Sequence, residues 1–277
     1  MRQLSTVAEL RSFVRDAPRP LGLVPTMGAL HAGHLSLVDR ARAECATVVA
    51  TIFVNPAQFG PAEDLDRYPR PLQHDLAALE RAGVDVAFVP SVDEMYGDGD
   101  ATKVRVGGPA LPFEGEARPG HFDGVATVVT KLLMQSAPDR AYFGRKDGQQ
   151  LAVVRRLVAD LHIPVEVVAV PTVREPDGLA VSSRNVYLSP EQRAAAPAVY
   201  RALAATRDRF RAGTQARETL ESGCRALLES EPRIDAVDYV AVVDPDTMEP
   251  WGGKAPAMLA VAVRMGDVRL IDNVLME

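Results

Sequence analysis

The segment PTMGALHAGH, residues 25–34, carries His31 and His34 three positions apart. It follows a predicted strand and opens a predicted helix, and the first N–H groups of a helix, with their partial positive charge, favour a phosphate group. Gly33 lets a ligand approach the backbone closely, while His31 and His34 project from one turn and can donate to phosphate oxygens. The spacing therefore indicates a site for a phosphorylated ligand.

Two other interpretations of this pair are open. Histidines at this spacing can be ordinary half-exposed surface side chains, or they can be ligands of a zinc ion. A catalytic zinc site needs a third ligand and a general base, but the sequence has no HExxH pattern and no further cluster of His and Cys. Zinc is therefore disfavoured.

A second candidate segment is Val181-Ser182-Ser183-Arg184-Asn185, after the fifth predicted strand. Two hydroxyls and a guanidinium are suitable donors around a polyphosphate, since Arg binds phosphate as a bidentate fork. Taken alone, the segment could equally be a helix cap or an exposed turn. The segment supports a phosphate site mainly because it occurs together with the His31–His34 turn.

The elements that must position these residues follow from hydrophobic patterning. Short β-branched runs alternate with stretches of helical spacing, which is typical of βαβ units and a parallel sheet. The predicted strands are Leu21 to Val24, Ala46 to Val54, Val84 to Val89, Arg140 to Phe143 and Val165 to Val170, and the predicted helices are Gly33 to Glu44, Pro71 to Ala82, Phe122 to Gln135 and Gly148 to Leu161. Such sheets bind ligands beyond the carboxyl ends of their strands, where both candidate segments lie.

The pattern changes near Tyr187. A long Ala/Arg-rich helix from Pro190, a second helix to about Glu229 and three strands (Ala236 to Val243, Met258 to Val263, Val268 to Ile271) follow. We therefore expect an α/β chain with a Rossmann-like domain at residues 1–186 and a smaller α+β domain at residues 187–277. The segment 107–124, rich in Gly and Pro, is expected to form neither helix nor strand and to act as a lid.

Charge and cysteine content restrict the class of partner. The 277 residues include 31 Lys+Arg and 37 Asp+Glu, a net charge of −6, and no long basic run, which is atypical of proteins that bind nucleic acid or an anionic membrane. The first residues lack the pattern of a signal peptide, and no apolar run approaches the ~20 residues that cross a bilayer. Cys45 and Cys224 lie in separate apolar-patterned segments, so we expect no disulfide and a cytoplasmic location.

Further segments extend the pattern over nearly the whole chain: IFVNPAQFGPAEDLDRYPR, FEGEARPGHFDGV, YFGRKDGQQ and VREPDGLAVSSRNVYLS. With the HxGH turn and the late Ser/Arg loop, they resemble the pantothenate synthetase (pantoate:β-alanine ligase) family of the HxGH nucleotidyltransferase superfamily. The resemblance implies an AMP-forming ligase that condenses pantoate with β-alanine through a pantoyl adenylate. It also implies a homodimer.

The resemblance also implies roles for individual residues. His34 would donate a proton, and His31, Lys146, Ser182, Ser183 and Arg184 would act beside the phosphates. The ATP contacts would be Met27, Gly28, Ala29, Leu30, His31, Ala32, Gly33, His34, Gly144, Arg145, Lys146, Asp147, Val173, Val181, Ser182, Ser183 and Arg184. Gln58, Gln150 and Asn55 would bind pantoate or β-alanine.

Two positions depart from the family pattern. Val181 stands where the family usually has Met, and His74 precedes Asp75 where another acid is expected. A Mg²⁺ ion is expected with ATP because it neutralises the leaving phosphates, and Asp75 is its candidate carboxylate. The chain has four lysines, so Lys146 within a motif is less easily explained by chance.

Three other functions are compatible with parts of the sequence pattern. A nucleotidyltransferase that stops after transferring AMP or CMP would share the HxGH turn but does not explain the NPAQF segment. A nucleotide-sensing module without turnover would bind ATP without releasing pyrophosphate. A tRNA synthetase is disfavoured because the residues after Tyr187 are few and more acidic than basic.

Overall fold

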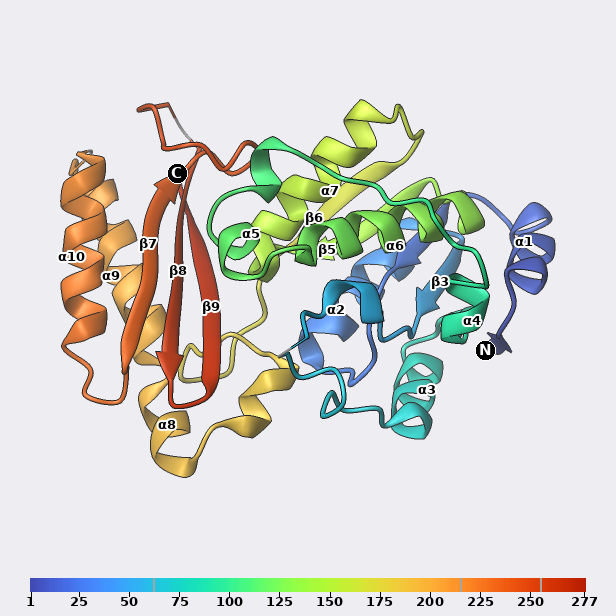
Figure 1. Ribbon diagram of the computed structural model, residues 1–277, viewed down its shortest axis with the longest axis horizontal. Coiled ribbons are helices and arrows are strands. Elements are labelled where there is room, and N and C mark those ends of the chain that lie inside the picture. Colours follow the sequence, from blue (N-terminus) through green and yellow to red (C-terminus); the bar gives the residue numbers. More distant parts are fainter. Residues whose placement is uncertain (62, 215, 255) are drawn as a thin grey trace. The chain divides into compact units, whose positions relative to one another are not determined.

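The computed structural model describes residues 1–61, 63–214, 216–254 and 256–277. Its contacts divide the chain into two compact units (Figure 1). Unit 1 comprises Met1–Gly144 and Val153–Val170, and unit 2 comprises Arg145–Ala152 and Pro171–Glu277.

Unit 1 contains a six-stranded parallel sheet with the strand order β1-β4-β3-β2-β5-β6. The strands are β1 (Arg2–Leu4), β2 (Leu21–Val24), β3 (Thr47–Thr51), β4 (Val86–Phe88), β5 (Arg140–Gly144) and β6 (Glu166–Val170). The parallel Rossmann-like sheet is thus confirmed, with five strands at the predicted places. The edge strand β1 was not predicted, since three residues without an apolar run give little signal.

Seven α-helices of the described residues connect these strands: α1 (Val7–Arg15), α2 (Ala32–Glu44), α3 (Leu72–Arg81), α4 (Val92–Met95), α5 (Glu114–Ala117), α6 (His121–Ser136) and α7 (Gly148–Asp160). The four predicted helices are α2, α3, α6 and α7, each with ends within one residue of the prediction. The apolar face of α2 packs with Val24 and Val48 of the sheet through Leu37, Val38 and Ala41.

The segment 107–124 is not free of regular structure, so that expectation was wrong. It contains the 3₁₀ turn η2 (Gly108–Ala110), the short helix α5 and the start of α6 at His121. Gly120 makes this possible because it precedes α6 in the left-handed region, at φ 83°, where a glycine is unstrained. The lid role stays a prediction.

Unit 2 contains an antiparallel sheet of β7 (Ala236–Val243), β8 (Ala257–Met265) and β9 (Val268–Met276), in that order. The helices α9 (Ala198–Arg211) and α10 (Arg217–Glu229) lie together on one side of it (Figure 1). Leu203, Leu220 and Val261 belong to the core that this packing buries. The smaller α+β fold is therefore confirmed.

Two details of unit 2 differ from the prediction. The single long helix from Pro190 is two helices, α8 (Pro190–Ala195) and α9, because Pro197 lacks the N–H that would continue the helix. The last strand continues through Asp272 and Asn273 to Met276 instead of ending at Ile271. Aspartate and asparagine are rare in strands, which explains why the pattern seemed to stop there.

The division into units departs from the predicted boundary between residues 186 and 187. Residues 145–152 and 171–186 group with the C-terminal sheet. The contacts responsible include the ion pair of Arg174 with Asp272 and the hydrogen bonds of Asn273 to the backbone of Arg145 and Lys146. These contacts join segments far apart in the sequence, which local patterning cannot anticipate.

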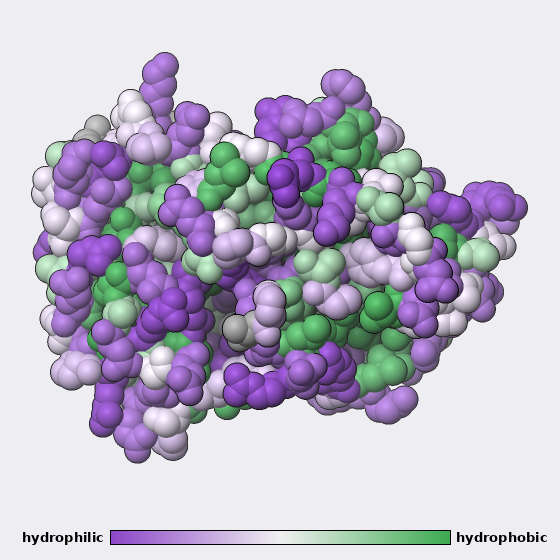
Figure 2. Space-filling view, in the orientation of Figure 1, coloured by the Kyte–Doolittle hydropathy of each residue, from purple (hydrophilic) through white to green (hydrophobic). Residues whose placement is uncertain are grey.

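Cys45 and Cys224 are free and buried, as expected. Within the ranges that the structure covers, no helix combines the length and the apolar character that a membrane crossing requires. On the face shown in Figure 2, hydrophilic residues are spread over the whole surface and are interrupted by several hydrophobic patches.

Candidate active site

The loop between β2 and α2 holds the first predicted group of ATP contacts. The buried carboxylate of Asp75 accepts hydrogen bonds from the backbone N–H groups of Ala29 and Leu30, each at 2.8 Å. Gly28 and Ala29 have positive φ values of 81° and 49°, and a Cβ on Gly28 would lie 2.9 Å from the Asp75 carboxylate. Asp75 thus stabilises a backbone conformation that Ala29 adopts only at some cost.

His31 and His34 lie at the N-terminus of α2, directly after this loop. His31 is the residue before the first helical turn, and the two imidazole rings stack with centroids 4.1 Å apart. A Cβ on Gly33 would lie 3.0 Å from the His31 ring, so the glycine leaves room for this stacking. The predicted projection of both rings from one turn is confirmed.

Asn55 and Gln58 lie beyond the carboxyl end of β3, in the 3₁₀ turn η1 (Pro56–Gln58) and the residue before it. The Asn55 amide donates to the Gln58 Oε1 (3.0 Å) and to the Gly124 carbonyl (3.2 Å). Its Oδ1 accepts from the Ala57 N–H (3.2 Å) and the Tyr96 hydroxyl (2.7 Å). Asn55 therefore orients Gln58, and Gln58 keeps its amide N–H₂ as the donor end.

Tyr96 supports this arrangement as a hydroxyl donor. Burial, and then the charge of Asp100, raise the pKa of Tyr96 to about 12. The phenol therefore stays protonated at neutral pH and continues to donate to Asn55.

The backbone of Gln58 is held by a second polar cluster of unit 1. His121 Nδ1 lies 2.8 Å from the Gln58 carbonyl oxygen, and Arg118 Nη1 lies 3.1 Å from His121 Nε2. Arginine can only donate, so Nε2 accepts and Nδ1–H donates to Gln58, which makes His121 neutral. Burial, and then the Arg118 charge, lower the pKa of His121 to about 4, in agreement with this assignment. Glu63 pairs with Arg118 on its other side.

A cavity of about 280 Å³ lies at the carboxyl ends of β2, β3 and β4 in unit 1. Most of the side chains around it are apolar, which suits the body of a small organic ligand. Its lining residues are Met27, Gly28, Ile52, Phe53, Val54, Arg70, Leu72, Asp75, Val89, Pro90, Ser91 and Val92.

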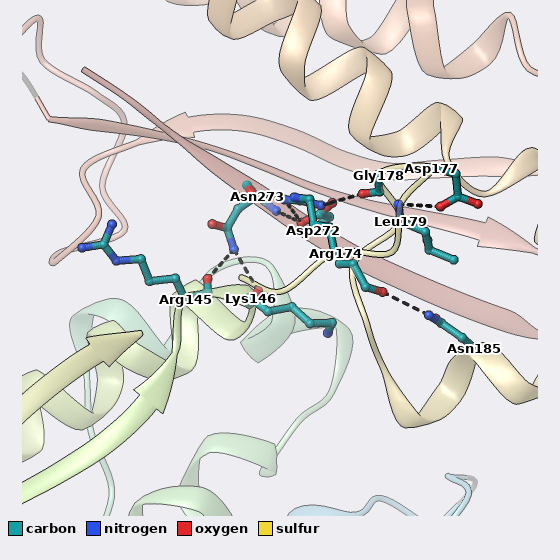
Figure 3. Close-up of polar contacts among 10 residues, drawn as sticks. Arg145, Lys146, Arg174, Asp177, Gly178, Leu179, Asn185, Asp272 and Asn273 are labelled. Atoms are coloured by element: carbon teal, nitrogen blue, oxygen red, sulfur yellow. Dashed lines mark hydrogen bonds and ion pairs between the residues drawn. The ribbon is translucent and has the colours of Figure 1, made fainter. Parts of the chain in front are cut away.

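In unit 2, the second predicted group begins with the 3₁₀ turn η3 (Arg145–Asp147), directly after Gly144. Asn273 of β9 donates from Nδ2 to the carbonyl oxygens of Arg145 (2.9 Å) and Lys146 (2.8 Å), as Figure 3 shows. The Lys146 ammonium lies 3.4 Å from the Asp147 carboxylate. Gln150 follows in the first turn of α7 and is half-buried.

Val173 and Val181 flank a hairpin in unit 2. The Val181 N–H donates to the Val173 carbonyl at 3.0 Å, and Arg174 pairs with Ala180 as an antiparallel bridge. The structure therefore brings together two predicted ATP contacts, Val173 and Val181, and Val181 leads into the predicted phosphate-binding residues Ser182, Ser183 and Arg184.

Ser182, Ser183 and Arg184 follow this hairpin. Ser182 caps the 3₁₀ turn η4 (Ser183–Tyr187), because its hydroxyl accepts from the Arg184 N–H at 3.3 Å. Asn185 ties the turn back to the hairpin by donating to the Ala180 carbonyl at 3.0 Å. All three predicted residues are half-buried. The helix-cap interpretation and the ligand interpretation of this segment are therefore compatible.

The geometry of Asp75 bears on the expected metal ion. Both carboxylate oxygens already accept backbone hydrogen bonds, and the side chain is 1% exposed. Among the residues that the structure describes, no three of His, Cys, Asp and Glu are grouped so that they could hold a metal ion. As placed, Asp75 is an anchor of the loop, and its role as a Mg²⁺ ligand stays a prediction.

Sequence reasoning missed the supporting residues Arg118, His121, Arg174, Asp272 and Asn273. Two of them carried a usable signal: Asp272-Asn273 interrupts an otherwise apolar run near Val274. Polar residues within a strand are buried only when they are hydrogen-bonded, so they mark a specific contact.

The chain was compared with known proteins. A protein-family model described as Pantoate-beta-alanine ligase matches residues 2–275. Pantothenate synthetase of Roseiflexus sp. (strain RS-1) is 55% identical over 278 residues, covering 100% of both chains. Pantothenate synthetase of Thermus thermophilus is 56% identical over 276 residues, covering 99% of this chain and 98% of that protein.

Solved structures agree with the fold. A crystal structure of pantothenate synthetase from Thermus thermophilus has a TM-score of 0.94 at 54% identity and covers 99% of both chains. A crystal structure of pantoate-beta-alanine ligase from Francisella tularensis, complexed with beta-gamma ATP and beta-alanine, has a TM-score of 0.81 at 34% identity. It covers 100% of this chain and 98% of that chain.

Proposed function

Because the chain belongs to the pantoate-beta-alanine ligase family, we propose that it condenses pantoate with β-alanine in two steps through a pantoyl adenylate. It is an ATP-dependent ligase, and its products are pantothenate, AMP and pyrophosphate. The observation that carries the proposed chemistry is the His31–His34 turn at the N-terminus of α2, beyond the carboxyl end of β2. Phosphates bind at such helix ends.

The first step activates the acid. An oxygen of the pantoate carboxylate attacks the α-phosphorus of ATP, the bond from that phosphorus to the bridging oxygen breaks, and pyrophosphate leaves. In the second step the neutral β-alanine amine attacks the acyl carbon, the bond to the AMP oxygen breaks so that AMP leaves with the electron pair, and the proton of the new amide nitrogen passes to solvent. Neither step requires a covalent bond to the enzyme, so positioning and charge stabilisation are its main contributions.

The proposed roles follow from side-chain chemistry. His34 donates a proton, and Lys146 with Ser182, Ser183 and Arg184 stabilises negative charge on the phosphates. The donor end of the Gln58 amide suits the pantoate carboxylate, and Gln150 can both donate to a carboxylate and accept from a hydroxyl.

We further propose that Mg²⁺ accompanies ATP. The ion neutralises phosphate charge and is usually held by the phosphates, waters and few protein ligands. The hydrogen bonds of Asp75 to Ala29 and Leu30 make it a support for the phosphate loop, and no step is assigned to a metal bound there. A homodimer and a cytoplasmic location belong to the same proposal: the homodimer rests on the family resemblance, and the location rests on the cysteine content.

Pantoate-dependent ATP–pyrophosphate exchange tests the first step. His34→Ala and Lys146→Ala are each expected to reduce the exchange rate roughly 10²–10³-fold, because each removes a donor to charge that develops on the phosphates. His162→Ala and Lys103→Ala are the matched controls, since both residues are exposed and outside the proposed site. Exchange near the wild-type rate in both site variants would contradict the assignment.

The second step separates this function from its rivals. Adding β-alanine is expected to release AMP together with pantothenate. A nucleotidyltransferase that stops after transferring a nucleotide would release no AMP at this point. A nucleotide-sensing module would bind ATP but show no pantoate-dependent release of pyrophosphate.

A further inference from the structure

Two neighbouring residues of one edge strand contact both proposed nucleotide loops of unit 2. Asp272 and Asn273 lie in β9, which pairs with β8 at one edge of the three-stranded sheet. They are 5% and 7% exposed, respectively. Burying a polar side chain costs free energy unless the side chain is hydrogen-bonded. The hydrogen-bond partners of Asp272 and Asn273 therefore indicate what these residues do.

Asn273 holds the turn that carries Lys146. Its Nδ2 donates to the Arg145 carbonyl at 2.9 Å and to the Lys146 carbonyl at 2.8 Å. Gly148 permits this approach: a Cβ there would lie 3.1 Å from Asn273 Nδ2 and 2.7 Å from Met258 Sδ. Both amide hydrogens of Asn273 are therefore donated to backbone carbonyl oxygens of this one turn.

Asp272 holds the hairpin that leads to the other loop. Its two carboxylate oxygens lie 2.6 Å and 2.9 Å from Nη1 and Nη2 of Arg174, a bidentate ion pair. Arg174 also donates to the carbonyls of Gly178 and Asn273, both at 3.2 Å. Its guanidinium carbon lies 3.9 Å from the centroid of the Tyr200 ring. The guanidinium is therefore fixed by charge, hydrogen bonds and stacking together.

The hairpin in turn fixes the predicted contacts at its two ends. Val173 precedes Arg174 and is hydrogen-bonded to Val181, from which the loop of residues 182–184 continues. Figure 3 shows Arg174 and Asp272 facing each other, with Asn273 turned toward the backbone of Arg145 and Lys146.

We propose that Asp272 and Asn273 are positioning residues for ATP: Asn273 sets the turn of Lys146, and Asp272, through Arg174, sets the hairpin between Val173 and Val181. This assignment rests on the proposed function, because those loops are the proposed ATP contacts. Neither residue is expected to touch substrate. They act by fixing the positions of the Lys146 turn and of the hairpin relative to the strand β9.

Asn273→Asp and Asn273→Ala test the first half of this assignment. Asn273→Asp keeps the shape of the side chain but replaces the donor with a carboxylate that repels two carbonyl oxygens. Both variants are expected to raise the KM for ATP about tenfold or more, with the KM for pantoate within about twofold of wild type. Ile271→Ala is the matched control, since it truncates a neighbouring half-buried side chain of β9 that has no group able to form a hydrogen bond with either loop.

Arg174→Lys tests the second half. A lysine keeps the charge but cannot form the bidentate fork. Amide hydrogen exchange followed by mass spectrometry is expected to increase over residues 173–185 in Arg174→Lys and over residues 145–150 in Asn273→Asp. If the substitutions only destabilised unit 2, amide exchange would increase throughout its core and not only in the loops. The control variant Ile271→Ala would then show the same increase.

Calorimetric binding of a non-hydrolysable ATP analogue keeps this test independent of turnover. Weaker binding of the analogue by Asn273→Asp and Arg174→Lys, with unaltered binding by Ile271→Ala, supports the assignment. Wild-type affinity in both site variants would overturn it. A wild-type chain that binds the analogue but shows no pantoate-dependent exchange would instead refute the proposed function.

Discussion

His121 is a buried neutral histidine, and its titration is expected to appear in the stability of the folded chain. Burial, followed by the Arg118 charge, lowers its pKa from 6.5 to about 4, although the Gln58 hydrogen bond and the charges of Glu63 and Glu114 oppose this. Between these two pH values the unfolded chain binds a proton that the folded chain does not. The free energy of unfolding therefore decreases as the pH falls through this window, by about 3 kcal/mol in total.

Urea unfolding between pH 7 and about pH 4.8 measures this effect. His121→Gln is expected to give a shallower decrease of the unfolding free energy, by up to about 1.4 kcal/mol per pH unit. His162→Gln, at an exposed position, is the control and is expected to follow wild type. Parallel profiles for wild type and His121→Gln would contradict the neutral assignment.

At the same scale, the sequence indicated some site residues and concealed others. His31 and His34 were recognisable because a short motif at a helix start has a direct physical meaning. The role of Asn55 was harder to predict, since only the structure reveals that its amide is engaged by Gln58, Gly124 and Tyr96. A residue type defines what a side chain can donate or accept, but its partners depend on the fold.

The close contact between α6 and the turn η1 is an element-scale constraint on Gln58. A Cβ on Gly124 would lie 2.2 Å from the Ala57 carbonyl oxygen and 2.6 Å from the Gln58 Cα. Gly124→Ala is therefore expected to push the turn away, to lower the unfolding free energy by about 1–3 kcal/mol, and to raise the KM for pantoate more than the KM for ATP.

Thermal unfolding and steady-state kinetics check this prediction. Gly252→Ala serves as the control, because nothing lies within 4 Å of a Cβ there. An unchanged KM for pantoate in Gly124→Ala would mean that η1 does not set the position of the bound acid.

Elements were predictable where one signal dominated. The buried strand β3 gave a continuous apolar run and the amphipathic helix α3 gave a helical periodicity, and their centres were located correctly. Helix α1 was missed although Thr6 and Glu9 form a capping box, and β9 was shortened at Asp272. The first error overlooks a capping signal, and the second arises at an element end, where long-range hydrogen bonds outweigh the apolar pattern.

For the whole molecule, charge is the property with the widest consequence. A net charge of −6 opposes contact with polyanions, whereas ATP and pantoate need only a local group of donors such as Lys146 and Arg184. The chain is therefore expected not to retard tRNA or duplex DNA in a gel-shift assay at physiological salt. Retardation that weakens steeply with added salt would contradict this expectation and would revive a tRNA-directed function.

The division into units shows what local patterning misses at this scale. The sequence pattern placed one boundary near Tyr187, but residues 145–152 group with unit 2 while the rest of α7 groups with unit 1. A single cut in the chain therefore cannot separate the two units. Cutting the chain after residue 186 would place Lys146 and Asn273 in different fragments, and the hydrogen bond that supports the Lys146 turn would be lost.

The hydrogen bond from Asn273 to Lys146 spans 127 residues of chain. During translation the ribosome therefore completes the parallel sheet and the Lys146 turn long before it makes the strand that holds this turn. A nascent chain at that stage contains the six strands of the parallel sheet and the Lys146 turn, but not the Asn273 amide that supports this turn. We therefore expect a growing polypeptide to bind ATP with full affinity only after β9 has been made, and a chain that terminates before β9 to bind ATP weakly.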